Sequence, residues 1–235
     1  MKNSIQIITE VIDNNSKLAK IKEIEIKKNS NVQYIFLLSD NAREFFQERV
    51  ISVKENAHAR FYFCYFGKDD INARLHYNIN KNARVEHNVV FFVSGQQKFY
   101  LDESYQFIST GSFGRFNVNG FVGGKARSNF VGNIMIDKGA QKTDSRLEAS
   151  AYLLSETAQS VMVPSLQIEA NNIKAGHAGK VSHISEEDLF YLNSRGLSET
   201  QAKELIVEGL FLEFVSELDD ATKKNILNIV KKRYQ

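Results

Sequence analysis

The sequence contains one cysteine, one proline and no tryptophan among its 235 residues. A single cysteine cannot form a disulfide within the chain, so the fold has to be stabilised by a hydrophobic core. A chain of this length can bury roughly 70% or more of its unfolded surface, which suffices for one large domain with a small appendage. Cys64 lies between aromatic residues, a setting typical of a buried strand thiol and compatible with a reducing cytosol.

Long apolar runs and a large excess of one charge are also absent. Runs such as residues 35–38 and 89–93 are far too short to span a bilayer, and the N-terminus has no hydrophobic signal core. The 30 basic and 28 acidic residues give a net charge of +2, which lacks the electrostatic footprint of a nucleic-acid binder. We therefore expect a soluble, cytoplasmic protein without nucleic-acid or membrane partners.

Motifs for nucleotide hydrolysis and zinc binding are missing as well. In residues 120–126 the first glycine stands one residue too close to the Gly-Lys pair, and Ala126 replaces the hydroxyl that would hold magnesium. These glycines are interpreted as a tight strand connection. The histidines, at positions 58, 76, 87, 177 and 183, include no convincing helical pair, and no CxxC or HExxH motif occurs. The chain is not expected to be an enzyme.

Between residues 32 and 184 the sequence repeats a short β-rich run followed by a polar turn. Each turn ends in a small residue, and these residues are Ala57, Ala83, Ser112, Ala126, Ala140, Ala158 and Ala175. The first two spacings are 26 and 29 residues, whereas the later spacings are 14 to 18 residues. This pattern favours a solenoid of flattened coils, each with two strands and two turns.

The strand-like runs fit a solenoid, although a β-sandwich would have strands of similar length. Residues 84–89 alternate between polar and apolar types, whereas residues 89–93 are apolar throughout. The single proline, Pro164, also suits a sheet structure, because each proline within a ladder removes a backbone donor.

The C-terminal part has a helical pattern with capping residues. Ser185 opens a capping box before a helix that ends at Ser194, and Gly196 stands where a left-handed residue commonly ends a helix. Ser198 opens a second helix by the same device, and a third begins near Asp219 or Asp220. In the second helix, apolar residues recur at helical spacing, at Ala202, Leu205, Ile206, Leu210, Phe211 and Phe214.

These patterns divide the chain into two parts. Residues 1–184 are expected to form the β core, within which residues 1–31 add irregular or edge strands. Residues 185–235 are expected to form a small helical subdomain.

His177 differs from the other histidines because small residues surround it within the segment 174–180. One interpretation is a metal or sulfide-site ligand that a second chain completes, because one imidazole supplies only one of the three or four ligands needed. The alternative is a histidine that is hydrogen-bonded to the backbone of a turn.

Four carboxylates offer a different chemistry, since glycan-cleaving β-helices use carboxylates spaced across a groove. They are Asp137, Asp144, Glu148 and Glu169. Without the register no pair can be chosen, and each also suits a solvated face. A β-helical glycan-binding or glycan-cleaving protein is therefore the alternative function.

Three motifs between roughly residues 100 and 217 resemble the SufB/SufD family, which comprises scaffold proteins of iron-sulfur cluster assembly. The first joins residues 129–134 and 139–144, the second runs from Pro164 to Ala178, and the third joins residues 186–191 and 194–198 with Ala202. The resemblance implies a right-handed parallel β-helix that pairs edge to edge with a second β-helix. It also implies that the C-terminal helices dock an ABC-type ATPase, SufC, which drives rearrangement of the pair.

The resemblance places His177 at the seam between the paired scaffolds, as a potential ligand of a nascent cluster. It also assigns the ATPase-docking surface to the helical tail, where Leu189, Phe190, Tyr191, Arg195, Gly196 and Leu197 would shape it.

Some residues depart from the family pattern. Ala149 stands where SufB-type members carry a cysteine, Ala178 where they tend to carry a glutamate, and Ala175 where SufD-type members often carry a cysteine. By residue type the chain is closer to SufD. Because iron-sulfur chemistry prefers thiolate ligands, we expect no cluster to be bound stably by this chain alone. A cluster is expected only transiently, at an interface with a SufB-like subunit or with a second copy.

Overall fold

The computed structural model describes residues 5–13, 21–39 and 45–232, and within these ranges the chain forms thirteen strands and three helices. The strands are β1 (Gln6–Ile12), β2 (Ile21–Ile26), β3 (Asn31–Leu38), β4 (Phe45–Val53), β5 (His58–Tyr65), β6 (Ile71–Ile79), β7 (Arg84–Val93), β8 (Lys98–Phe107), β9 (Phe113–Val122), β10 (Arg127–Ile136), β11 (Asp144–Leu153), β12 (Gln159–Ile168) and β13 (Lys174–His183). The helices are α1 (Glu186–Ser194), α2 (Glu199–Val215) and α3 (Asp220–Lys231).

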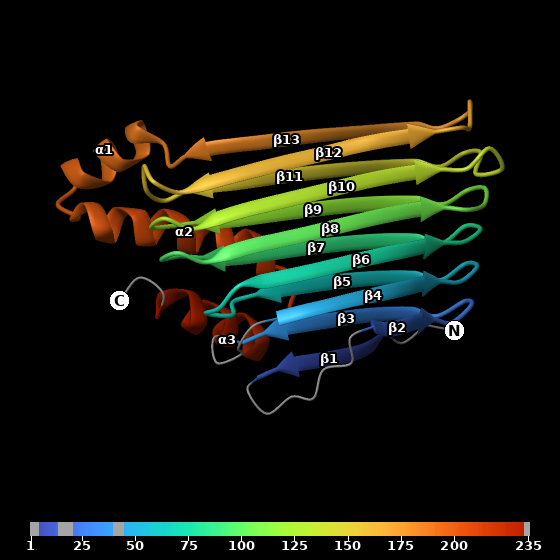
Figure 1. Cartoon of the computed structure of the whole chain (residues 1–235). Coiled ribbons are helices and arrows are strands. Elements are labelled where there is room, and N and C mark those ends of the chain that lie inside the picture. Colours follow the sequence, from blue (N-terminus) through green and yellow to red (C-terminus); the bar gives the residue numbers. More distant parts are fainter. Residues whose placement is uncertain (1–4, 14–20, 40–44, 233–235) are drawn as a thin grey trace.

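The strands form two parallel sheets that the chain visits alternately (Figure 1). One sheet has seven strands in the order β1-β3-β5-β7-β9-β11-β13, and the other has six in the order β2-β4-β6-β8-β10-β12. Each strand thus pairs with the strand two positions along the chain, and two strands with their turns make one flattened coil. The predicted parallel β-helix is confirmed, and the β-sandwich alternative is wrong because the strand pairs are parallel.

The turns explain the two spacings in the sequence. Ala57, Ala83 and Ser112 lie in successive turns at one end of the coils, whereas Ala126, Ala140 and Ala158 alternate between the two ends. The spacings of 26 and 29 residues therefore correspond to one whole coil, and the later spacings of 14 to 18 residues correspond to half a coil. The prediction is wrong at the seventh turn, because Lys174 and Ala175 already belong to β13, and Ala170 is the small buried residue there.

Asparagines stack along one row of turns. Asn29, Asn56 and Asn82 have positive φ angles of 59°, 56° and 54°, a conformation that asparagine tolerates better than most residues. The Asn56 side chain donates to Asn29 (3.1 Å), and the Asn82 side chain donates to Asn56 (3.2 Å). The ladder ends at Gly111, where a Cβ would lie only 2.4 Å from Oδ1 of Asn82.

Inside the coils, one residue of each successive strand of the seven-stranded sheet falls in the same column. One such column runs through Tyr34, Phe61, His87, Phe116 and Leu147, all of them buried. Glycines occur where any side chain would collide with a neighbouring aromatic ring. At Gly120, for example, a Cβ would lie 2.1 Å from the Phe91 ring. The expected strand connection therefore begins only at Gly123, because Gly120 lies inside β9.

The interior also holds a buried polar cluster on three neighbouring strands. His87 Nε2 lies 2.9 Å from Glu103 Oε1, and the Tyr77 hydroxyl lies 3.0 Å from His87 Nδ1. The Tyr105 hydroxyl donates to the other Glu103 oxygen. Each of these polar side chains has a partner, as buried polar groups require.

A second polar cluster closes the N-terminal end of the β-helix. Glu10 on β1 lies 2.9 Å from the buried guanidinium of Arg49 and 2.7 Å from Nζ of Lys22, and the Tyr34 hydroxyl donates to it. Burial alone would raise the pKa of Glu10. The hydrogen bond and charge of Arg49, together with hydrogen bonds from Lys22 and Tyr34, outweigh this effect and lower the pKa from 4.5 to about 2. Inward-pointing charges of this kind oppose the addition of another strand.

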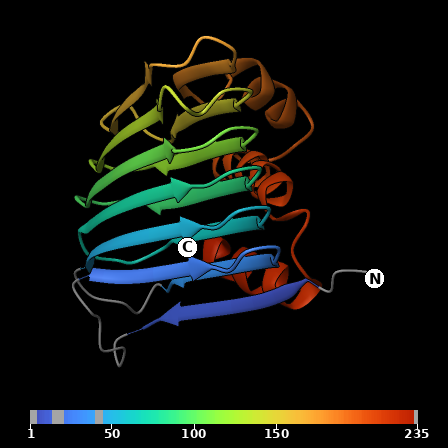
Figure 2. The ribbon, with the colours of Figure 1, turned by 90° about the vertical axis from the view of Figure 1, so that its right-hand side faces the viewer.

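Helices α2 and α3 cover the outer surface of the seven-stranded sheet, and Figure 2 shows the helices on one side of the stacked strands. This explains the apolar run 89–93, because Val90 and Phe92 point outward beneath the helices while their neighbours point into the coils. Cys64 lies in the same apolar layer, and burial raises the pKa of its thiol well above the usual range. In the part of the chain that the structure describes, no helix is both long and apolar enough to cross a membrane.

The Glu10 cluster predicts acid sensitivity. Because the folded-state pKa of Glu10 is lowered from 4.5 to about 2, its contribution to stability is present above pH 4.5 and is lost as the pH falls through 2. Glu10→Gln should lower the free energy of unfolding near pH 7 by about 3 kcal/mol, since it leaves Arg49 buried without its carboxylate. Denaturant unfolding at several pH values measures both effects.

The matched control is Glu25→Gln, which removes an exposed partner of Lys54 and should change the stability by about 1 kcal/mol or less. The role assigned to the cluster would be contradicted if both variants lost the same free energy of unfolding. It would also be contradicted if Glu10→Gln lost stability at acid pH in the same way as the unchanged protein.

Candidate functional site

The C-terminal end of the β-helix is the candidate site, because its last coil carries no further strand among the described residues. Strands β12 and β13 are the terminal strands of their sheets and lie together at the top of Figure 1. Each therefore presents backbone N–H and C=O groups without strand partners along one side.

His177 lies on β13 directly above Leu147 in register, so it continues the inward-facing column described above. The residues below it in that column are buried, but His177 is exposed since no coil lies over it. Within the described residues its imidazole makes no hydrogen bond or ion pair, and it stands in the middle of a strand. The alternative interpretation was a hydrogen bond from this histidine to the backbone of a turn. The described residues contain no such hydrogen bond.

The coil around His177 is thin. A Cβ on Gly179 would lie 3.2 Å from the Pro164 ring on β12, so this glycine allows the two sheets to approach closely. Pro164 lies on an edge strand, where a proline costs the sheet least. The imidazole consequently stands at an open rim with small neighbours.

The open end is apolar as well as unpaired. Its exposed large apolar side chains are Val161, Val163, Ile168 and Val181, of which Val163 is 46% exposed. The opposite end also exposes large apolar side chains, those of Ile5, Ile7, Val11 and Ile21, but it holds the charged Glu10 cluster between its first two coils. The two ends of the solenoid therefore differ in how they would meet a second sheet.

Metal ligands are few at this end. The described residues include no group of three or more His, Cys, Asp or Glu side chains that could hold a metal ion. Cys64 lies beneath the helices and is fully buried, so the structure does not bring it to His177.

The four carboxylates singled out in the sequence do not form an acid–base pair within the described residues. Asp144 lies 2.8 Å from Arg115, and Glu148 accepts from Arg146. Asp137 accepts a hydrogen bond from Gln106, and Glu169 lies in the turn after β12. The paired side chains serve to hold neighbouring residues of the outer surface.

The helical tail contains the second group of predicted residues. Ser185, Ser198 and Asp219 cap the three helices, and Gly196 has the left-handed conformation expected of it, with a φ of 93°. No residue of α1 is buried.

Of the six residues assigned to docking, Phe190, Tyr191 and Arg195 are exposed, and Phe190 is 75% exposed. The Arg195 guanidinium lies 5.2 Å from the centre of the Tyr191 ring. Leu189 and Leu197 are half-buried, and Leu189 packs toward the apolar layer.

Sequence reasoning missed two further exposed leucines. Leu205 and Leu212 on α2 are about half exposed, although the helical spacing grouped Leu205 with core residues. The sequence did contain a signal for this exposure, because the apolar residues of α2 occupy more than one face of the helix and only one face can pack on the sheet.

The connection between the two groups is short. Only Ile184 and Ser185 separate the end of β13 from the start of α1. Ile184 is buried in the apolar layer, and the Ser185 side chain caps α1 by accepting from Asp188 N at 3.2 Å. Because only two residues join them, the strand that carries His177 is tightly connected to α1, the helix without a buried residue.

Comparison with known proteins identifies the family. A family model described as SUF system FeS cluster assembly, SufBD core domain, matches residues 2–210. The chain belongs to the SufBD family. This agrees with the resemblance seen in the three sequence motifs and with the parallel β-helix.

Individual relatives of the SufBD family are similar over about half of the chain. The SufD protein of Bacillus subtilis strain 168 is 31% identical over 116 residues, which cover 49% of this chain and 26% of the relative. The SufD protein of Escherichia coli K12 is 31% identical over 113 residues, covering 48% and 27%. A SufBD family protein of Mycobacterium tuberculosis H37Rv is 37% identical over 94 residues, covering 40% and 24%. The matched segments thus span about a quarter of each relative.

Proposed function

We propose that this chain is a noncatalytic scaffold subunit of a cytoplasmic, Suf-type iron-sulfur cluster assembly complex. In this proposal the open end of the β-helix pairs with a second scaffold subunit, and the helical tail docks a SufC-like ABC-type ATPase. The observation that carries the proposal is the unpaired rim formed by β12 and β13, which holds an exposed His177, whereas the N-terminal end holds the charged Glu10 cluster between its first two coils.

Pairing at the open end would satisfy the backbone groups of β12 and β13 and bury Ile168 and Val181, which face the open interior of the last coil. Burial of apolar surface contributes roughly 25 cal/mol per Å², so a seam across two strands is a reasonable interface. The partner is either a SufB-like subunit or a second copy of this chain. Mass measurement after co-expression with candidate SufB-like and ATPase chains separates these two cases.

The chemistry at the seam requires a partner. Iron-sulfur clusters prefer thiolate ligands, and the only thiol of this chain is buried away from His177. His177 would therefore supply one imidazole to a transient cluster, and the partner would supply the remaining ligands. The cluster is the cargo of the complex in this account.

Docking at the tail is supported by the exposed aromatic residues of α1. Aromatic and arginine side chains are enriched at protein interfaces, which suits Phe190, Tyr191 and Arg195. The two-residue link to β13 gives a physical route by which a moving ATPase would shift the seam strand.

The pairing surface can be tested with a charge. Val181→Lys should place an ammonium at the open interior of the last coil and weaken association with the scaffold partner at least tenfold, because the charge would have to be desolvated. Analytical ultracentrifugation of the full chain with its partner measures this. Ile7→Lys is the control, since Ile7 is 60% exposed and lies on β1 at the other end of the β-helix. Equal weakening by both variants would place the seam elsewhere.

The docking surface can be tested without removing the helices. Deleting residues 186–235 would expose the apolar layer over the sheet and destabilise it, so side-chain truncation is the better design. Phe190→Ala combined with Tyr191→Ala should leave the thermal midpoint nearly unchanged, because both side chains are exposed, and should abolish capture by an immobilised SufC-like ATPase. Phe46→Ala, at an exposed site on the other sheet, serves as the control. Undiminished capture by the double variant would refute docking at α1.

The ligand role of His177 predicts a third outcome. His177→Ala should preserve folding and pairing, because the imidazole makes no bond within the described residues, but should lower cluster assembly in cells. His183→Ala, at an exposed histidine on the same strand, should retain assembly. Full assembly activity in His177→Ala would remove the ligand role.

A further inference from the structure

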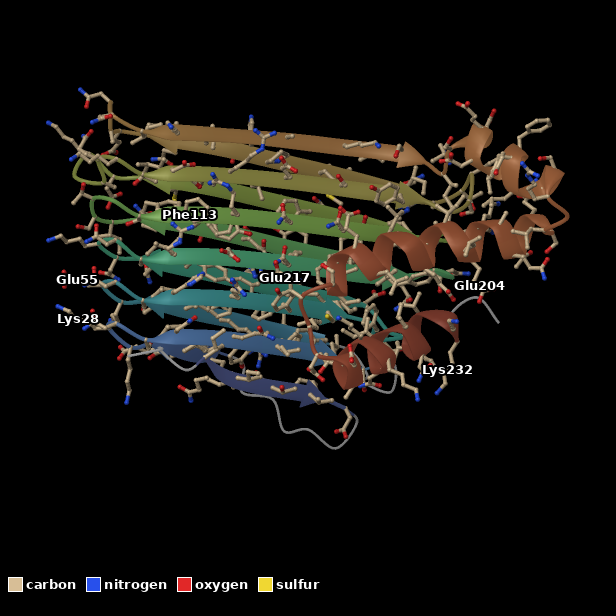
Figure 3. The ribbon with its side chains drawn as sticks, turned by 180° about the vertical axis from the view of Figure 1, so that it is seen from behind. Lys28, Glu55, Phe113, Glu204, Glu217 and Lys232 are labelled. Atoms are coloured by element: carbon tan, nitrogen blue, oxygen red, sulfur yellow. The ribbon has the colours of Figure 1, made fainter. Side chains whose placement is uncertain are left out.

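A groove of about 590 Å³ lies on the outer surface of the seven-stranded sheet, beside the C-terminal end of α2. Strands β7, β9 and β11 supply most of its floor, and the last turns of α2, which end near Glu217 in Figure 3, supply one wall. The groove is separate from the rim that holds His177, because its residues point outward and His177 lies on an inward-facing column.

The floor has unused hydrogen-bonding capacity. Asn117 donates to Asn88 at 3.0 Å, which leaves the remaining amide groups of both residues available. Next along the strands, Asn119 and Ser150 are adjacent in register, and neither side chain forms a hydrogen bond within the described part of the chain. The floor thus offers both donors and acceptors in a row across neighbouring strands.

The charge of the lining is negative. The charged residues that line the groove are Glu86, Glu148, Glu213, Glu217 and Arg115. Most of these charges already have partners: Arg115 pairs with Asp144, Glu86 with Arg60, and Glu148 with Arg146. Glu217 accepts from the Tyr62 hydroxyl at 3.0 Å and lies 3.7 Å from Arg60. The Glu213 side chain forms no hydrogen bond or ion pair with any described residue, so its carboxylate is the charge of the lining that is left for a ligand.

The end of α2 adds to this potential. The 17-residue helix has no basic residue in its last turn, so the negative end of its dipole is not compensated by its own side chains. Ser216 and Glu217, which follow this end, line the groove. The helix terminus and the unpaired Glu213 carboxylate therefore both favour a positively charged ligand.

The aromatic rings of the groove are already covered. The Phe113 ring lies between the guanidinium groups of Arg84 and Arg115, at 4.0 and 4.2 Å from its centre. Tyr152 stacks on Phe121, with ring centres 5.4 Å apart, and Lys180 approaches the Tyr152 ring. Sugars and bases bind proteins by stacking on free aromatic faces, which these rings do not offer.

We propose that this groove binds a short extended segment of a partner polypeptide that carries lysine or arginine. The asparagine amides and Ser150 pair with the main chain of the segment, and the Glu213 carboxylate receives its cationic side chain. Three neighbouring strands span about 10 Å, which matches about three residues of extended chain. This site goes beyond the scaffold role and does not depend on it.

The test uses the full chain and a fluorescent, end-blocked eight-residue peptide of alternating lysine and threonine. Anisotropy should show saturable binding that weakens with added salt, and NMR should show shifts of the side-chain amides of Asn88, Asn117 and Asn119. A peptide of alternating glutamate and threonine should not bind. Glu213→Lys should weaken binding of the cationic peptide about tenfold or more, because it replaces attraction with repulsion.

Glu204→Lys makes the same charge change nearer the other end of α2, outside the groove, and should leave the affinity within about twofold. Circular dichroism and thermal midpoints of both variants establish that they fold. The proposal is overturned if no cationic peptide binds at about 1 mM, if the two α2 variants lose affinity equally, or if the acidic peptide binds as well. Binding of spermidine with the same Glu213 dependence but without peptide binding would also overturn it, in favour of a small polyamine ligand.

Discussion

A stacked β-helix has to satisfy the backbone groups of its first and last strands, and the two ends of this protein meet that constraint differently. Each inner strand is paired on both sides in register, but β1, β2, β12 and β13 are each paired on one side only. At the N-terminal end a carboxylate, a buried guanidinium and an ammonium lie together between the first two coils. At the C-terminal end small and apolar residues leave the rim open around His177. The proposed pairing follows from this difference.

The same register links the seam to the helical tail. Because His177 and Ile184 belong to one continuous stretch of β13 and its connection, a displacement of α1 would act on the strand that carries the imidazole. The remaining helices are anchored more firmly, since Val207 and Phe211 of α2 pack on the sheet, while α1 has no buried residue. The tail therefore combines a fixed part with an exposed part, which suits the proposed docking of a moving partner.

Local sequence signals predicted much of this architecture. The turn residues gave the flattened coils because asparagine and glycine accept positive φ angles, and the capping serines and Asp219 gave the helix starts within one residue. Interactions between distant residues were not predictable in this way. Glu10 and Arg49 are 39 residues apart, and Tyr62 and Glu217 are 155 residues apart, so only the register of the folded coils reveals these contacts. Gly120 was misread for the same reason, because the Phe91 ring that requires it lies on the neighbouring strand. The sequence singled out His177, but its position at an open rim depends on the stacking of β13 over Leu147.

Hydrogen–deuterium exchange of the full chain, alone and with the proposed scaffold partner, tests the asymmetry of the two ends most directly. The account predicts that amides of β12 and β13 become protected on association, because they gain strand partners, while those of β1 and β2 exchange as before. Protection at β1 with unchanged exchange at β13 would contradict it.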